Sequence, residues 1–223
     1  MMDEIKEAIQ SMANNNFYAY LALTSKLESP IRDKVAFYLN NMEGYRNKVG
    51  REYSVRFDER EYPIRFDIGI EEIRNERKEL DIVEFAAWYS FDLIGRTLPK
   101  KIKVKICEDF CRYENLENRP NNNFFCVSNF FYVIVACHPE ERIQDRYIDI
   151  IAYATGINNM YNNNENSQVN LDNALTNMRQ LYPDQDPNGE RSGSISLGTD
   201  FGIPVKMIYA IFSKEQIQEI YNG

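Results

Sequence analysis

Acidic and basic side chains are the residues of this chain whose types and spacing could do chemistry. Asp67, Glu76 and Lys78 bring two carboxylates and one lysine into a short stretch. Two carboxylates can hold a divalent cation, and a lysine beside them can help to polarise the water that attacks a phosphodiester. The three residues therefore form a candidate site for metal-dependent hydrolysis.

The order of these residues resembles the Asp…Glu-x-Lys pattern of restriction-endonuclease-like enzymes, and the resemblance implies a metal-dependent nuclease. The chain departs from that pattern in one respect. In the family the Glu-x-Lys pair belongs on an apolar strand, whereas Glu76 and Lys78 lie in the charged segment 71–79, which is typical of a solvated surface. Three further acids lack a companion lysine: Asp81, Glu108 and Asp109.

Other catalytic schemes find little support in the sequence. His138 is the only histidine, which removes Ser-His-Asp and His-rich metal sites unless His138 itself takes part. Its place before Pro139 predicts a cap or turn residue. No glycine-rich phosphate-binding motif occurs, and three late glycines are expected to serve turns and a bulge: Gly193, Gly198 and Gly202. We therefore commit to no catalytic, cofactor-binding or metal-binding residue.

The cysteines are expected to be reduced thiols, mostly in the core. They are Cys107, Cys111, Cys126 and Cys137. No two of them have the Cys-x-x-Cys spacing of a zinc site, and an unpaired cysteine in a strand behaves as a small hydrophobic residue.

Charge and hydropathy narrow the classes of partner. The net charge is −8 with a sequence pI near 4.9, so nucleic acid is not expected as a partner, because its phosphates need a basic face. The densest basic cluster is Lys100, Lys101, Lys103 and Lys105. The chain begins with an acidic amphipathic segment rather than a secretory signal, and no apolar run is long enough to span a membrane. We expect a cytoplasmic protein, or a virion protein if a phage encodes it.

Hydrophobic periodicity predicts helices first and a sheet afterwards. Residues 1–49 show helical spacing, for example at Ile5, Ala8 and Ile9. Tyr53 to Ile70 alternates in the manner of a hairpin, with Pro63 predicting an edge position. Segment 71–78 is expected to be a loop or short helix. Segment 80–94 stays open between helix and strand, because its apolar content permits both.

The central part of the chain carries the strongest local signals. Segment 124–137 predicts a buried strand, and His138-Pro139 predicts the start of a helix that ends at Gly156. Lys101, Lys103 and Lys105 alternate with apolar residues and predict a strand with a lysine row outside. A polar loop is expected over 160–168, then a short helix, one or two late strands, and a last helix opened by the capping box of Ser213 and Gln216.

These patterns together predict an α+β fold, with a mostly antiparallel sheet, packed helices and a helical N-terminal part. We expect one domain over 1–223, of which 1–49 is the helical part and 50–223 the sheet with its helices.

The order of the predicted elements also resembles the tail-terminator and neck proteins of bacteriophages. The corresponding parts are 2–12, 53–70, 130–154 and 203–212. The resemblance implies ring-forming subunits without an active site. Our leading expectation is therefore a non-enzymatic subunit that binds other protein subunits, as a homo-oligomer or in a mixed assembly. The carboxylate nuclease is the alternative, and an adaptor that binds one partner protein is a third possibility.

Overall fold

One mixed sheet organises the molecule. The computed structural model describes residues 1–55, 63–74, 77–94, 98–117, 125–181 and 189–222. In these ranges the sheet has six strands in the order β1-β2-β3-β4-β6-β5, and only β3 and β4 run parallel to each other. The predicted α+β class with a mostly antiparallel sheet is therefore confirmed. The strands are β1 Val49–Val55, β2 Ile64–Arg74, β3 Arg77–Tyr89, β4 Phe125–Pro139, β5 Ser192–Asp200 and β6 Ile203–Ser213.

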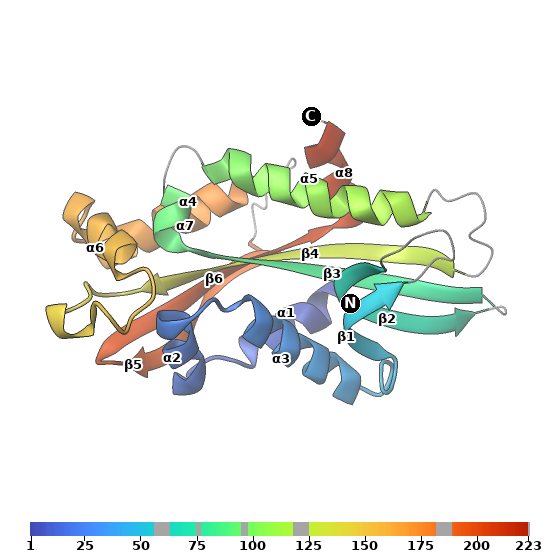
Figure 1. The fold of residues 1–223 in the computed structure, drawn as a ribbon, viewed down its shortest axis with the longest axis horizontal. Helices are drawn as coiled ribbons and strands as arrows, with labels where there is room; N and C mark the ends of the chain where they lie inside the picture. The colour runs from blue at the N-terminus through green and yellow to red at the C-terminus, as the bar shows by residue number, and fades with distance from the viewer. Residues whose placement is uncertain (56–62, 75–76, 95–97, 118–124, 182–188, 223) are drawn as a thin grey trace.

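Helices cover both faces of the sheet (Figure 1). On one face lie α1 Met2–Gln10, α2 Asn16–Thr24 and α3 Glu28–Asn41, and on the other lie α4 Ser90–Ile94, α5 Leu98–Glu117, α7 Ser167–Arg179 and α8 Lys214–Asn222. Helix α6, Ala154–Asn163, lies at one end of the sheet. Two hydrophobic clusters result, one on each side of the sheet. No helix in the described part of the chain has both the length and the apolar character to cross a membrane.

The helical N-terminal part agrees with the prediction. Ile5, Ala8 and Ile9 of α1 are fully buried against the sheet. The side chain of Asn15 caps α2 by accepting a hydrogen bond from the backbone N–H of Phe17, 3.1 Å away. A local pattern and a local cap were sufficient to locate these helices.

Residues 71–74 and 77–78 of the charged segment are neither loop nor helix, so the prediction was wrong for them; residues 75 and 76 lie outside the described ranges. The described residues form the end of β2 and the start of β3, which pair through Arg74 and Arg77. Their ion pairs include Lys78 with Glu71 at 3.4 Å. Segment 80–94 resolves as strand followed by the short helix α4.

Two features of the predicted hairpin can be compared with the structure. The start of β2, which follows Pro63, lies at an open edge as predicted, because Ile64 to Phe66 pair with β1 alone and pairing with β3 begins only at Ile68. The expected turn at 58–61 lies outside the described residues.

The predicted lysine-faced strand at 102–106 is helix α5 instead. Ile102, Ile106, Phe110 and Tyr113 are buried at spacings of four, four and three residues, which is the helical period. Alternation over only five residues fits either structure. The longer repeat decides the outcome because it places one continuous apolar stripe against the sheet.

The central strand is confirmed as β4, but the helix expected after Pro139 was wrong. Segment 140–153 contains turns and a single 3-10 turn at Asp145–Tyr147. The amide of Asn158 bonds both the N–H and the C=O of Ile143, at 2.7 and 3.0 Å, which holds this segment out of a helix. Gly156 lies inside α6 rather than at a helix end, and the predicted polar loop 160–168 belongs mostly to α6 and α7.

The late elements follow their local signals. β5 and β6 form a hairpin whose turn residues Phe201 and Gly202 have φ values of 52° and 73°. The register shifts between Ser196 and Gly198, which is the expected bulge. The backbone N–H of Ser213 donates to Oε1 of Gln216 at 3.0 Å, so the capping box opens α8 as predicted.

Candidate functional site

The sheet forks between β2 and β3. Their last pair at this end is Ile68 with Val83. Beyond this pair, β2 pairs only with β1. Strand β3 continues to Tyr89 and pairs there only with β4. Asp67 and Glu84 are the first residues of the two diverging strands.

Carboxylates from three different elements cap the open edge of β3. The backbone N–H of Phe85 donates to Oδ2 of Asp67 at 2.9 Å. The next N–H groups on this edge donate to Glu28 Oε2 of α3 at 3.3 Å and to Asp92 Oδ2 of α4 at 3.2 Å. An unpaired strand edge needs such partners, because buried backbone donors are costly to leave unmade. The fork therefore gathers acidic groups for a structural reason.

Glu84 is the most perturbed acid at the fork. Its residue is only 4% exposed, and its Oε1 has no hydrogen-bond partner among the described residues. Burial raises the pKa of Glu84 well above its ordinary value; the nearby carboxylates of Asp67 and Asp109 raise it further, and Arg112 opposes them. These causes together favour the protonated form of Glu84.

Cations approach the fork from two helices. Arg32 of α3 places Nη1 3.4 Å from Oδ1 of Asp67. On α5, the buried Asp109 pairs with Lys105 Nζ at 3.2 Å and with Arg112. Tyr132 of β4 donates its hydroxyl to Asp109 at 2.9 Å. Acids and bases from both faces of the sheet thus meet where the strands part.

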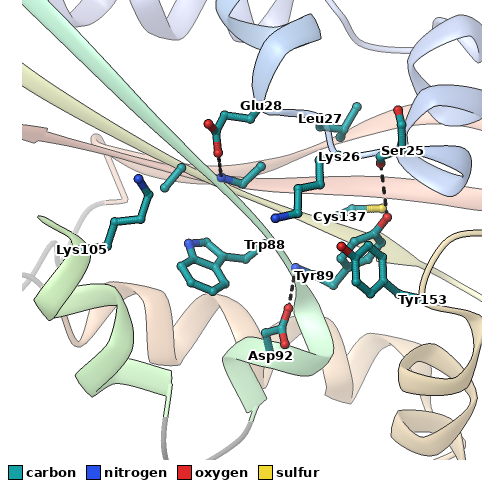
Figure 2. Close-up of a pocket in the computed structure, with 12 residues that line it drawn as sticks. Ser25, Lys26, Leu27, Glu28, Trp88, Tyr89, Asp92, Lys105, Cys137 and Tyr153 are labelled. Carbon is teal, nitrogen blue, oxygen red and sulfur yellow. Dashed lines mark hydrogen bonds between the residues drawn. The ribbon is translucent and has the colours of Figure 1, made fainter. Parts of the chain in front are cut away.

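A cleft of about 260 Å³ follows the open edge of β3. Figure 2 shows its walls: the segment from Ser25 to Glu28 on one side, Asp92 and Lys105 on the other, and Trp88 between them. The indole Nε1 of Trp88 is buried and has no hydrogen-bond partner among the described residues. The lining of the cleft thus carries two lysines, Lys26 and Lys105, and two carboxylates, Glu28 and Asp92, around one indole.

The structure brings together only part of the site predicted from the sequence. Asp67 lies at the fork. Lys78 lies six residues before Glu84 on β3, roughly 20 Å along the strand, and Glu76 lies outside the described residues. Lys78 and Asp67 therefore do not form one site.

The alternative acids have separate environments. Asp81 accepts a hydrogen bond from Asn129 Nδ2 at 2.8 Å, and Glu108 is exposed. Asp109 alone lies near the fork, where its charge raises the pKa of Glu84.

Sequence reasoning missed Glu84. The available signal was one carboxylate inside the apolar run Ile82-Val83-Glu84-Phe85-Ala86. An acid in such a run must be buried, paired or functional. Trp88, Lys26 and Glu28 carried no comparable signal, because their meeting depends on the fold.

His138 is a buried structural link rather than the predicted turn residue. It lies in β4, where Nδ1 is 2.8 Å from Ser90 Oγ of α4 and Nε2 is 3.0 Å from Ser167 Oγ of α7. Burial lowers the pKa of His138 to about 4, so the ring is neutral at physiological pH. Three elements are thereby joined around one imidazole.

The cysteines are all free thiols, as expected. Cys137 is buried, which raises the pKa of its thiol. Cys107 and Cys111 are half-buried on α5, and Cys126 is exposed, so only Cys137 is a core thiol of the predicted kind.

Within the ranges that the structure describes, no group of three or more His, Cys, Asp or Glu residues is placed to hold a metal ion. Any cation at the fork would have two carboxylate ligands, Asp67 and Glu84. Comparison with protein-family models, with curated proteins and with solved structures gives no match.

Proposed function

We propose that this protein is a divalent-cation-dependent phosphodiesterase that acts on nucleic acid, with Asp67 and Glu84 as its cation-binding carboxylates. The observation that carries the proposal is the unsatisfied, buried Oε1 of Glu84 beside a second carboxylate. The free oxygen of Glu84 lies beside the carboxylate of Asp67, and a shared divalent ion would use that oxygen and favour the charged form of Glu84, which burial and Asp67 oppose.

The residues present fit such an ion. Mg²⁺ prefers oxygen ligands and is commonly bound through one or two carboxylates, with substrate phosphates and waters completing the shell. Asp67 and Glu84 supply that number. When bound, the ion would polarise a phosphodiester and lower the pKa of a water molecule.

Asp67 and Glu84 agree with the restriction-endonuclease-like pattern better than Asp67 with Glu76 and Lys78. That pattern has the acid of its Glu-x-Lys pair on an apolar strand, and Glu84 lies on such a strand, next to the strand of Asp67. The position two residues after Glu84 is Ala86 rather than lysine. Lys105 of α5 lines the same cleft as Ala86 and pairs with Asp109, so it can supply the missing positive charge.

Local charge supports an anionic substrate although the whole chain is acidic. Lys26 and Lys101 lie close enough to Asp92 to lower its pKa against the effect of burial. Lys26 and Lys105 line the cleft, and Lys105 and Arg112 pair with Asp109 near the fork, so basic side chains lie among the acids of this region. Such a local patch can attract phosphates even where net charge is negative.

The test is cation binding followed by cleavage. We expect the wild-type protein to bind Mn²⁺ in calorimetry and to cleave oligonucleotides when Mn²⁺ or Mg²⁺ is added. Glu84→Gln and Asp67→Asn should each abolish both, while Glu108→Gln, an exposed acid of α5, should change neither. A wild-type protein that neither binds Mn²⁺ at millimolar concentration nor cleaves any oligonucleotide would overturn the proposal.

A second candidate function is the assembly subunit, and an exposed aromatic patch favours it. Phe17 and Tyr20 of α2 are 60% and 44% exposed. Tyr20 stacks on Phe201 with ring centroids 6.2 Å apart, and Tyr147 contacts Phe201 edge-on at 5.2 Å. Contiguous exposed aromatic side chains are typical of protein–protein interfaces. A ring subunit, including the phage tail or neck type, and an adaptor would both use such a patch.

Light scattering tests this second candidate. We expect an oligomer that dissociates on the double substitution Tyr20→Ser and Phe201→Asn, the latter chosen because asparagine tolerates the positive φ of that turn. A wild-type protein that stays monomeric at high concentration and whose hydrodynamic behaviour is unchanged by the double substitution would count against it.

A further inference from the structure

The cleft beside the fork has the size of one nucleotide rather than of paired strands. Its volume of about 260 Å³ lies just below the range of about 300–1,000 Å³ that is usual for sites of drug-sized ligands. A duplex cannot enter such a hollow, since its major groove alone is about 12 Å wide. The shape therefore selects a single unpaired unit.

The chemistry of the walls matches the parts of a nucleotide. Trp88 offers an apolar ring on the lining of the cleft. Figure 2 shows the amino groups of Lys26 and Lys105 on either side of the indole. Aromatic rings and lysines are the usual means by which proteins hold unpaired bases and the backbone between them.

The acids of the cleft do not oppose an anionic ligand at its centre. Glu28 and Asp92 are already engaged by the backbone N–H groups of Ala87 and Tyr89. Both carboxylates therefore face the strand edge, while the side chains of Lys26 and Lys105 remain at the walls.

The cleft is continuous with the fork along one strand edge. The N–H groups of Phe85 and Ala87, capped by Asp67 and Glu28, are two residues apart on β3, about 7 Å. A nucleotide whose base lies against Trp88 would thus place an adjacent phosphate within reach of the two carboxylates of the fork.

We propose that this cleft binds one unpaired nucleotide of a polynucleotide strand, with its base against the indole of Trp88 and its phosphate between Lys26 and Lys105. The inference rests on the proposed phosphodiesterase function and specifies its substrate: a single strand or an unpaired end rather than an intact duplex. The phosphate and the base are common to DNA and RNA, so the sugar is left to the experiment.

The experiment uses Trp88 as its own probe, because it is the only tryptophan of the chain. Oligodeoxyuridylate and oligouridylate of ten nucleotides, which differ only in the sugar, are titrated into the protein in EDTA, so that no cation-dependent cleavage occurs. We expect saturable quenching of Trp88 fluorescence by one or both oligonucleotides, and the stronger ligand identifies the sugar. A blunt duplex of the same length should quench at least tenfold more weakly.

Matched lysine variants locate the bound strand. Lys26→Ala and Lys105→Ala should each weaken binding at least threefold and reduce the slope of log affinity against log salt by about 0.7, as expected for one lost phosphate contact with a single strand. Lys103→Ala, an exposed lysine of the same helix, should leave both quantities unchanged. Thermal melts of each variant confirm that the protein is folded.

The outcomes separate this inference from the function on which it rests. No quenching by either single strand, equal quenching by the duplex, or equal losses in Lys103→Ala and Lys105→Ala would each overturn the nucleotide site, whatever the cleavage assay shows. Quenching that persists in Glu84→Gln, a variant expected to lose cation binding, would support it, because the cleft contacts do not depend on that acid.

Discussion

The free energy of unfolding should fall as the pH is lowered from neutral to mildly acidic values, and replacing His138 with glutamine should remove most of that fall. His138 is the only histidine and is buried between Ser90 and Ser167, whose hydroxyl oxygens lie 2.8 and 3.0 Å from its ring nitrogens. Glutamine also has one donor and one acceptor group, so it can contact both hydroxyls without titrating.

The expected magnitude follows from the two pKa values of the imidazole. Burial lowers the pKa of His138 from an ordinary 6.5 to about 4 in the folded protein. As the pH falls below 6.5, the unfolded chain takes up the proton first, so folding loses stability until the folded pKa is reached. The full loss is about 3 kcal/mol, of which about 2 kcal/mol is already lost at pH 5.

The assay is urea unfolding of the wild type and of His138→Gln at several pH values from 7.5 to 5. All other titrating groups are common to both proteins, so the difference between the two unfolding free energies isolates the histidine. We expect that difference to change by about 2 kcal/mol in favour of the variant across this range. In addition, NMR of the intact protein should show one histidine with a pKa far below 6.5. A difference that does not vary with pH, or a histidine that titrates near 6.5, would refute the reasoning.

Three further predictions concern the fork and the helix that begins at Ala154. Glu84→Gln should stabilise the protein progressively as the pH rises above 4.5 in urea unfolding, because a raised folded pKa means that the wild type loses stability with rising pH from that value on, and glutamine does not ionise; a marked loss of stability would contradict this. Because the raised pKa favours the protonated form of Glu84, binding of Mn²⁺ should release protons, which calorimetry in two buffers of different ionisation enthalpy measures; zero release would show that the ion displaces no proton from Glu84. Gly156→Ala should destabilise by about 1–3 kcal/mol, because its added Cβ would lie 2.7 Å from the ring of Phe91, whereas Gly44→Ala, with nothing within 4 Å, should not destabilise; equal effects would exclude the contact as the cause.

The parts of the fold that the sequence predicts correctly are those with complete local signals. The N-terminal helices have apolar residues at helical spacing, and α8 has its capping box at Ser213. The short run from Lys101 to Lys105 fits both the strand period and the helical period. The packing of the longer apolar stripe of α5 decided that it is helical. The segment after Pro139 failed for a different reason, because Asn158, distant in sequence, occupies the backbone groups of Ile143.

The candidate site was harder to predict than the fold. Asp67 was found because it precedes Glu76 and Lys78 in an Asp…Glu-x-Lys order. Glu84 was missed, although it lies in an apolar run, because its significance depends on the register at which β2 leaves β3. Lys105 was assigned to an outer row, and only the helical period of α5 turns it towards the cleft. Pairing register and helix rotation are long-range outcomes that spacing alone does not determine.

The fork explains why structural and chemical roles coincide in the same side chains. A strand that loses its neighbour exposes backbone N–H groups, and short acidic side chains are good acceptors for them. Asp67 caps Phe85 for this reason and, by doing so, comes to lie beside Glu84. Asparagine at position 67 could keep the cap, because its side-chain oxygen also accepts, but it would remove the negative charge. The pKa of Glu84 would then fall towards its ordinary value while the strand edge stayed satisfied. In the proposed cation site, the charge of Asp67, and not its hydrogen bond, would therefore be the contribution that asparagine loses.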